Sequence, residues 1–316
     1  MNWKRTLLLI FVLTGLAFFY YHKLYHKPVE TQPAFSLDAS QRYVLQLSNN
    51  EAVKRLSLDN PSKKLAISFE KDINNKWQIV SPVRFPAEPL IVDGFVTLLK
   101  LTPRLRHLSL DGLDSKDFGF DHPALKIYVG VSDQPNRCLV IGARSVIGEG
   151  AYARWENETT YFLVEQVFLN AFDKTLYTVR KKQIFSLMDD EITLIHFDSS
   201  SKDITIVQEG DHWMLKKPVE AIVSPQAMDA LLTEIGSLYV KEFLDDEKTT
   251  DLKSNFDKTP RTIRVSFKHS KQKLIQGSLA AGRDAYYAHL NEPDTVFLVS
   301  QGKLNHLEET FSKLSS

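Results

Sequence analysis

The sequence predicts an α+β fold, in which an N-terminal transmembrane helix precedes two tandem related units with largely antiparallel sheets and amphipathic helices. Three observations support this prediction: an uncharged apolar run near the N-terminus, a pattern of strands and helices that occurs twice, and strands and helices that are segregated rather than strictly alternating. The 316 residues, of which 43% are hydrophobic and 25% charged, are enough for two ordinary globular domains.

The apolar run extends from Leu7 to Tyr21 and follows Lys4 and Arg5. As a helix it would rise about 22 Å, so flanking residues must complete a hydrocarbon core of about 30 Å. The alternative is a cleaved signal peptide, but the bulky exit from Ala17 to Tyr21 lacks the small residues that cleavage needs. We therefore expect an uncleaved anchor. The residues expected to span the membrane include Leu7, Leu8, Leu9, Ile10, Phe11, Val12, Leu13, Phe18, Phe19, Tyr20 and Tyr21.

The basic residues Lys4 and Arg5 favour a cytoplasmic N-terminus, although Lys23 and Lys27 on the far side weaken this preference. The prediction is a single-pass protein of the cell inner membrane whose C-terminal region is periplasmic or extracytoplasmic. The expected organisation is an anchor with its flanks (1–27), a linker and entry segment (28–51), a first unit (52–175), a junction (176–189) and a second unit (190–316).

Two tryptophan motifs organise the region after the linker. Trp77 stands five residues before Pro82, and Trp213 stands five residues before Pro218. Each motif follows a strand-like run and precedes a helical pattern with one apolar face, first near 92–99 and again near 228–235. Alternating strands follow at 125–131 and 262–267. The markers of the repeat are Trp77, Pro82, Pro123 and Gly142 in the first unit and Trp213, Pro218, Pro260 and Gly282 in the second.

These markers are expected to maintain the fold. Each tryptophan should cover the apolar helix that follows it, with ligand stacking as the alternative. The prolines should end their strands, and Gly142 and Gly282, which we pair with one another, should form tight turns. The basic stretch 180–182 is expected at the junction, and residues 184–187 either begin the second unit or connect the two.

The order of these motifs resembles the bacterial family called domain of unknown function 4340. The resemblance rests on Trp77, Pro82, Gly119, Pro123, Gly142, Tyr152, Ala153 and Arg154. The second unit departs from the pattern, because Asn255 replaces glycine and His289 stands where arginine is expected. The resemblance implies a single-pass envelope protein, often encoded beside gliding-motility-type ABC transporter permeases. It implies an accessory role, with ABC transporter subunits as possible partners, and no established activity.

Motifs of common enzymes are missing from the sequence. It contains no nucleotide-binding glycine loop with Lys-Ser/Thr, no nucleophile elbow and no His-Glu-x-x-His helix, so we expect a protein that is not an enzyme and has no cofactor or metal. Residues 142–150 are expected to form a hairpin rather than a phosphate cradle. His22 and His26, and the acidic runs 189–191 and 245–247, have the spacing or charge for a cation, but a juxtamembrane helix end and solvated loops explain them better.

Charge and cysteine content exclude further classes of protein. Four of the 39 basic and one of the 39 acidic residues precede residue 34, which leaves the rest with a net charge of −3. An acidic body argues against nucleic acid as a partner. Cys138 is the single cysteine, so no intrachain disulfide can form, and its strand-like surroundings indicate a buried structural thiol rather than a nucleophile.

The most plausible contact residues are Tyr152 and Arg154, which strand alternation places on one face, opposite Ala153 and Trp155. The alternative is that Tyr152 and Arg154 only pack against neighbouring strands and contact no partner. The functional prediction is a membrane-anchored, non-enzymatic envelope accessory protein that binds partner proteins, foremost an ABC-type transport complex. The alternative is a tethered binding module for a glycan, lipid or peptide in the cleft between the units. A third reading is an unrecognised hydrolase.

Overall fold

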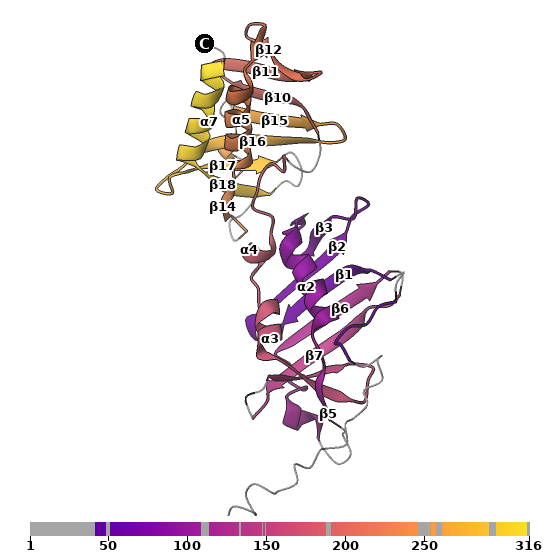
Figure 1. The fold of residues 1–316 in the computed structure, drawn as a ribbon. Coiled ribbons are helices and arrows are strands. Elements are labelled where there is room, and N and C mark those ends of the chain that lie inside the picture. Colours follow the sequence, from indigo (N-terminus) through magenta and orange to yellow (C-terminus); the bar gives the residue numbers. More distant parts are fainter. Residues whose placement is uncertain are drawn as a thin grey trace, which may run out of the picture.

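The computed structural model describes residues 42–48, 51–108, 114–132, 134–146, 148, 150–187, 191–245, 252, 254–256, 261–290 and 295–314. These residues form two units, each built on one nine-stranded antiparallel sheet (Figure 1). The expected transmembrane run, His22, His26 and the linker 28–41 lie outside the described residues. In the part of the chain that is described, no helix has both the length and the apolar character needed to cross a bilayer.

The two sheets share one topology. The first has the order β4-β3-β2-β1-β6-β7-β8-β9-β5, and the second has the order β13-β12-β11-β10-β15-β16-β17-β18-β14. Every strand of the first unit thus has a counterpart in the second, which confirms an α+β fold with two tandem related units. The bounds of the first sheet are β1 Val53–Asn60, β2 Leu65–Lys71, β3 Trp77–Ser81, β4 Phe85–Pro86, β5 Leu105–Leu108, β6 Leu125–Val131, β7 Arg137–Arg144, β8 Ala151–Trp155 and β9 Tyr161–Val164. The bounds of the second are β10 Ile192–Ser199, β11 Lys202–Glu209, β12 His212–Lys217, β13 Ala221–Val223, β14 Val240–Phe243, β15 Arg261–Phe267, β16 Lys271–Ala280, β17 Ala285–Leu290 and β18 Val296–Ser300.

One face of each sheet is covered by helices (Figure 1). Helix α2 (Pro89–Leu101) buries Val92, Phe95 and Leu99, and helix α5 (Pro225–Gly236) buries Met228, Leu231 and Ile235. Spacings of three and four residues place these side chains on one stripe, so the helices predicted from the sequence are confirmed. The remaining helical segments are η2 Pro61–Lys63, η3 Ser115–Phe118, α3 Gln166–Phe172, α4 Leu176–Val179, η4 Ser254–Phe256 and α7 Gln301–Leu314.

The second face of each sheet carries a smaller apolar cluster under a 3-10 helix. In the first unit, Phe118 of η3 packs there with Cys138, Val140 and Tyr161. In the second unit, Phe256 of η4 packs against a cluster that includes Leu298. Both units therefore have a helix-covered main core and a smaller core on the opposite face of the sheet.

Trp77 belongs to the main core of the first unit, with 3% of its surface exposed. Its indole Nε1 donates a hydrogen bond of 2.8 Å to Oδ1 of Asp93 on α2, so the ring covers the helix that follows it, as predicted. Trp213 is half-buried and packs against the second core. Pro82 and Pro218 come directly after β3 and β12, and the peptide bond before each is cis.

Replacing Trp77 with phenylalanine is expected to lower the free energy of unfolding by about 2 kcal/mol, because a hydrogen bond to a carboxylate is lost inside a packed contact. Thermal unfolding followed by circular dichroism measures this change. Trp213→Phe is the matched control and should cost less, since its ring is only half-buried. Asp93→Asn keeps an acceptor oxygen and should be milder than Asp93→Leu. Equal losses in these last two variants would contradict the role of the hydrogen bond.

The prediction for Gly142 is wrong. Gly142 lies inside β7, not in a turn, and its counterpart is Gly277 in β16 rather than Gly282. A Cβ atom at Gly142 would lie 2.1 Å from the carbonyl oxygen of Phe118, and one at Gly277 would lie 2.6 Å from that of Asn255. Both glycines therefore let a 3-10 helix approach the sheet. Gly282 does lie in a turn, with φ at +72°.

Candidate functional site: the groove between the two units

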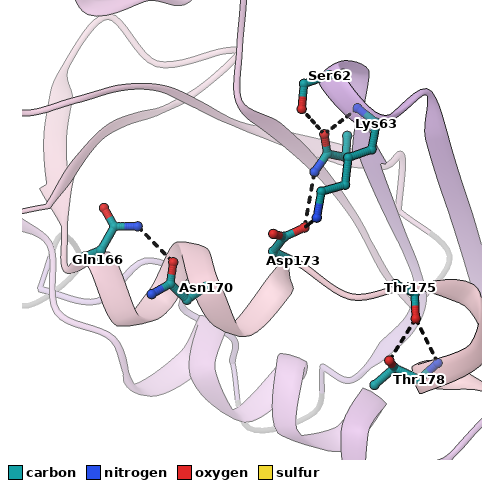
Figure 2. Close-up of polar contacts among 8 residues, drawn as sticks. Ser62, Lys63, Gln166, Asn170, Asp173, Thr175 and Thr178 are labelled. Carbon is teal, nitrogen blue, oxygen red and sulfur yellow. Dashed lines mark hydrogen bonds and ion pairs between the residues drawn. The ribbon is translucent and has the colours of Figure 1, made fainter.

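The chain leaves the first unit through α3 and α4, and polar contacts hold this exit in place (Figure 2). Lys63 of η2 forms an ion pair with Asp173, which follows α3. Thr175 caps α4, because its hydroxyl oxygen accepts a hydrogen bond from the backbone N–H of Thr178 at 3.2 Å. These contacts within the first unit thus fix the direction in which the chain leaves it after α4.

Residues 180–184 then run as a single extended segment from α4 to the second unit (Figure 1). We call this segment the inter-unit linker, to distinguish it from the linker that follows the N-terminal run. Its backbone is bridged first to the edge of the first sheet, at Ala87, and then to the second unit, at Tyr239. Hydrogen bonds to both sides extend this pairing. They run from Glu88 N to Val179 O (2.7 Å), from Lys181 N to Pro86 O (2.9 Å), from Val240 N to Lys182 O (2.8 Å) and from Ile184 N to Leu238 O (3.0 Å).

We call the contacts of residues 180–184 with both units the joint. Arg180 lies at its centre, and its side chain is fully buried. Its guanidinium donates to both carboxylate oxygens of Asp245, at 2.6 and 2.8 Å. The same group lies 5.7 Å from the ring centroid of Phe85 in the first unit and 4.4 Å from that of Phe243 in the second. These two rings also meet edge to face, 5.1 Å apart. An ion pair that is buried on the side of Arg180 and exposed on the side of Asp245, together with an aromatic contact, therefore connects the units.

A groove opens beside the joint and is lined by both units. It consists of two adjoining hollows, of about 320 and 170 Å³, with Lys76 and Gln272 lining both. The smaller hollow is mainly apolar, and the larger is mainly polar. We call these two hollows together the inter-unit groove. The smaller is lined by Lys76, Gln78, Phe85, Pro86, Lys181, Gln183, Ile184, Val240, Gln272, Leu290 and Phe297, and the larger by Asn74, Lys76, Ser186, Phe267, His269, Ser270 and Gln272.

The charge of the groove lining differs from that of the body. Lys76, Lys181 and His269 line it, and no aspartate or glutamate does so among the described residues. The carboxylate of Asp72 lies at the rim, where it accepts hydrogen bonds from the backbone N–H of Lys76 at 2.9 Å and from Nε2 of Gln78 at 3.1 Å. The lining thus differs in composition from the chain after residue 33, which is weakly acidic.

Two buried polar atoms of the lining lack a protein partner among the described residues. They are Oγ of Ser186, a residue that is 9% exposed, and Oε1 of Gln272. Buried polar atoms are nearly always hydrogen-bonded, and the cost of leaving one unpaired is about 1–3 kcal/mol.

The predicted contact residues Tyr152 and Arg154 lie elsewhere, on β8 in the first unit. As predicted, they point away from the main core, which contains Ala153 and Trp155. The Tyr152 ring meets that of Phe118 edge to face at 4.8 Å. The guanidinium of Arg154 lies over the rings of Phe120 and Tyr161, at 5.3 and 5.8 Å. Both side chains thus pack on the smaller core, and a role for them in an interface stays a prediction.

Cys138 is buried in the same small core, as predicted. Burial raises the pKa of its thiol above the usual value, so the thiolate is disfavoured in the folded protein. We expect iodoacetamide to label Cys138 very slowly in the native protein and fully in guanidinium, as measured by mass spectrometry. Because the folded pKa is raised, the contribution to stability is complete below about pH 8.5 and declines above it. Rapid labelling of the folded protein would contradict this assignment.

The other predicted features have simple structural roles where they are described. Strands β7 and β8 pair as a hairpin, as expected, and the described residues of its connection are 145, 146, 148 and 150. Asp245 lies in an exposed turn after β14, and its carboxylate is the partner of Arg180. No cluster of three or more potential metal ligands occurs among the described residues. Pro123 precedes β6 and is half-buried, whereas 188–190, 246–250 and Pro260 lie outside the described residues.

Sequence reasoning expected a cleft between the units for the alternative binding module but named none of its residues, because its walls come from residues near 76, 181 and 270 that only the fold brings together. The one local indication was the basic stretch 180–182 at the junction. Of these three side chains, Lys181 faces the groove, Arg180 is buried in the joint and Lys182 donates to the carbonyl oxygens of Thr178 and Arg180. Charge alone could not distinguish these three roles.

Comparisons with known proteins give one match. No curated protein and no solved structure is detectably similar to the chain. Residues 77–258 match a family described as domain of unknown function (DUF4340). The match begins at Trp77 in the first unit and ends after η4 in the second, so it includes the joint and parts of both sheets. Because it covers more than half of the chain, the protein belongs to the family of domain of unknown function 4340.

Proposed function

We propose that this chain is a non-enzymatic binding protein of the cell envelope, held at the membrane by its N-terminal segment, whose partner enters the inter-unit groove. The observation that carries the proposal is the construction of the groove. Its lining comes from both units and the inter-unit linker, and two of its buried polar atoms have no protein partner among the described residues. A site of this kind requires two units in a defined arrangement, and the joint provides one.

The groove favours binding over catalysis. Its lining includes one histidine and two lysines but no carboxylate among the described residues, so it lacks the paired acid and base that hydrolysis normally needs. The partner class that the family resemblance implies is an ABC-type transport complex. The anchor and the membrane location are likewise part of the proposal and rest on the apolar run from Leu7 to Tyr21.

The test is affinity purification of the full-length protein from detergent-solubilised membranes. Ser270→Trp places a large side chain in the larger hollow, at an exposed turn residue. Ser201→Trp is the matched control, because it makes the same change in an exposed turn of the same unit away from the groove. We expect transporter subunits to co-purify with the unmodified protein and the control, and at least tenfold less with Ser270→Trp. Equal recovery with both variants, or recovery of no transporter subunit, would overturn the proposal.

A second candidate, a tethered module for a glycan or lipid, has less support from the groove. Glycans commonly stack on exposed aromatic faces, but Trp77 is buried and hydrogen-bonded to Asp93, and Phe85 and Phe297 line the groove with at most 3% of their surfaces exposed. A lipid would need a large apolar cavity, whereas the mainly apolar hollow has a volume of only about 170 Å³.

A further inference from the structure

We infer that the face of the first sheet that carries the smaller core is a second contact surface, on which the guanidinium of Arg154 binds an acidic side chain of a partner polypeptide. Arg154 belongs to β8 and lies away from the inter-unit groove, so this inference goes beyond the proposed function. Its evidence is an arginine without a polar partner, the aromatic rings that hold it, and the corresponding row of the second unit.

Arg154 carries a charge that no polar group of the described chain balances. Its contacts are with the rings of Phe120 and Tyr161, and it forms no ion pair or hydrogen bond with a described residue. Its Nε atom is closed off from solvent, whereas the two terminal amino groups of this half-buried side chain reach the surface. A guanidinium is always charged, and its two terminal groups match the two oxygens of a carboxylate. The terminal amino groups, and not Nε, are therefore the binding groups.

The aromatic rings hold the guanidinium in place before a ligand arrives. Its central carbon lies 5.3 Å from the ring centroid of Phe120 and 5.8 Å from that of Tyr161, and these two buried rings pack 4.7 Å apart. An arginine held in this way loses less side-chain freedom on binding than a mobile surface arginine does. The half-buried Tyr152 lies two residues away on the same face, and tyrosine with arginine is typical of surfaces that anchor a protein partner.

A second cation lies in the same row of the sheet. Lys126 of β6 and Arg154 of β8 both pair with Val140 of β7, so their Cα atoms are roughly 10 Å apart. Two carboxylates share this face: Asp59, which pairs with Lys126 from β1, and Glu156, which follows β8 near Cys138. Neither forms an ion pair with a described residue. An anionic bilayer surface would meet both acids, whereas a single acidic side chain can contact Arg154 alone, which favours a polypeptide partner.

The second unit provides an internal comparison. Strand register equates the row of Lys126 and Arg154 with Thr262, Ile275 and His289. The ring of His289 meets that of Phe256 edge to face at 4.7 Å, and its Nδ1 lies 2.8 Å from the carbonyl oxygen of Leu290. The second unit thus keeps an aromatic neighbour in this place but has no lysine or arginine in the row. The two cations are therefore not required by the shared fold, which is what a binding surface of the first unit alone predicts.

The test measures binding of a fluorescein-labelled, C-terminally amidated peptide, Gly-Glu-Tyr-Glu-Gly, to the full-length protein in an uncharged detergent by fluorescence polarisation. Gly-Gln-Tyr-Gln-Gly, labelled and amidated in the same way, is the neutral probe. Arg154→Met removes the charge but keeps an apolar side chain over the rings, and Arg154→Lys keeps the charge but removes the forked donors. Arg84→Met is the matched control, because it removes an exposed arginine elsewhere on the first unit. Circular dichroism verifies that each variant is folded.

We expect the acidic probe to bind the unmodified protein at least tenfold more tightly than the neutral probe does. Arg154→Met should lose about tenfold in affinity for the acidic probe, Arg154→Lys about threefold and Arg84→Met less than twofold. Lys126→Gln leaves Arg154 and its rings in place and should lose about threefold, so the inference stays testable if Arg154→Met does not fold. The preference for the acidic probe should shrink in 0.5 M salt, where charges are screened.

Three results would overturn the inference. The first is equal affinity for the two peptide probes, and the second is a loss in Arg84→Met as large as the losses in the Arg154 variants. The third is stronger competition by glycerol 3-phosphate than by glutarate, which would assign the surface to a phospholipid headgroup. Ser270→Trp should leave binding of the acidic probe unchanged, because Ser270 lines the inter-unit groove. A tenfold loss in that variant would place the probe in the groove and contradict the inference as well.

Discussion

Replacing Gly142 with alanine is expected to lower the free energy of unfolding of the first unit by about 3 kcal/mol, the upper part of the usual range for overpacking. The added Cβ would lie 2.1 Å from the carbonyl oxygen of Phe118 and 3.2 Å from the carbonyl carbon of Gly119. Both are backbone atoms, so no side-chain rotation relieves the clash. Helix η3 must move off the sheet, which also disturbs the aromatic contacts of Phe118 with Tyr152 and Tyr161. Denaturation in urea, followed by circular dichroism, measures the loss.

The chain contains matched controls for this substitution. Gly94→Ala lies in α2 with no atom within 4 Å of the added Cβ, and it should stabilise by about 1 kcal/mol through helix propensity. Gly282→Ala also meets open space but has φ at +72°, so strain should cost about 1 kcal/mol. Gly277→Ala should resemble Gly142→Ala in the second unit. If Gly142→Ala were as mild as Gly282→Ala, the close approach of η3 to β7 would be contradicted.

Removing the carboxylate of Asp245 is the second substitution with a large expected effect. Asp245→Ala leaves the fully buried guanidinium of Arg180 without its bidentate partner. Because the Asp245 side chain is itself 33% exposed, the expected cost is about 3 kcal/mol, the lower end of the range for breaking buried ion pairs. The loss falls on the joint, because Arg180 lies between Phe85 and Phe243. We expect the two units to unfold in separate calorimetric transitions and the radius of gyration in small-angle X-ray scattering to increase.

The controls distinguish this effect from a general loss of charge. Glu220→Ala removes one partner of the exposed Lys216–Glu220 pair and should leave both the unfolding transition and the scattering curve unchanged, because solvent screens exposed pairs. Arg180→Met together with Asp245→Leu removes both charges and should recover much of the loss, because an apolar pair of similar volume avoids an unpaired buried charge. Unchanged scattering and a single transition in Asp245→Ala would refute the role of this pair in joining the units.

The larger elements could be predicted from the sequence because each carries a repeated pattern. Helices α2 and α5 show apolar residues at intervals of three and four, and β6 shows alternation over its whole length. The shortest strands, β4 and β13, have two and three residues, which is too few for any period to appear. They were missed for this reason, and the sequence offered only the prolines that precede them.

The remaining errors concern relations between distant residues. Gly142 was paired with Gly282 because both follow strand-like runs, but register equates it with Gly277: Leu139 and Leu274 pair with Ile127 and Ile263 at matching positions. The need for glycine comes from the carbonyl of Phe118, which no local pattern reveals. The residues that line the groove were hidden for the same reason, since Lys76, Lys181 and His269 come together only after both sheets have formed.

The joint also bears on self-association. Unpaired outer strands are the places where sheet proteins aggregate, because their free N–H and C=O groups can pair with another molecule. Here the inter-unit linker is bridged to Ala87 beside β4 and to Tyr239 beside β14, which occupies one outer side of each sheet. The opposite outer strands are β5, of four residues, and β13, of three. Copies of the protein could therefore pair edge to edge only through β5 or β13, and strands of this length offer few backbone hydrogen bonds to hold a fibril together.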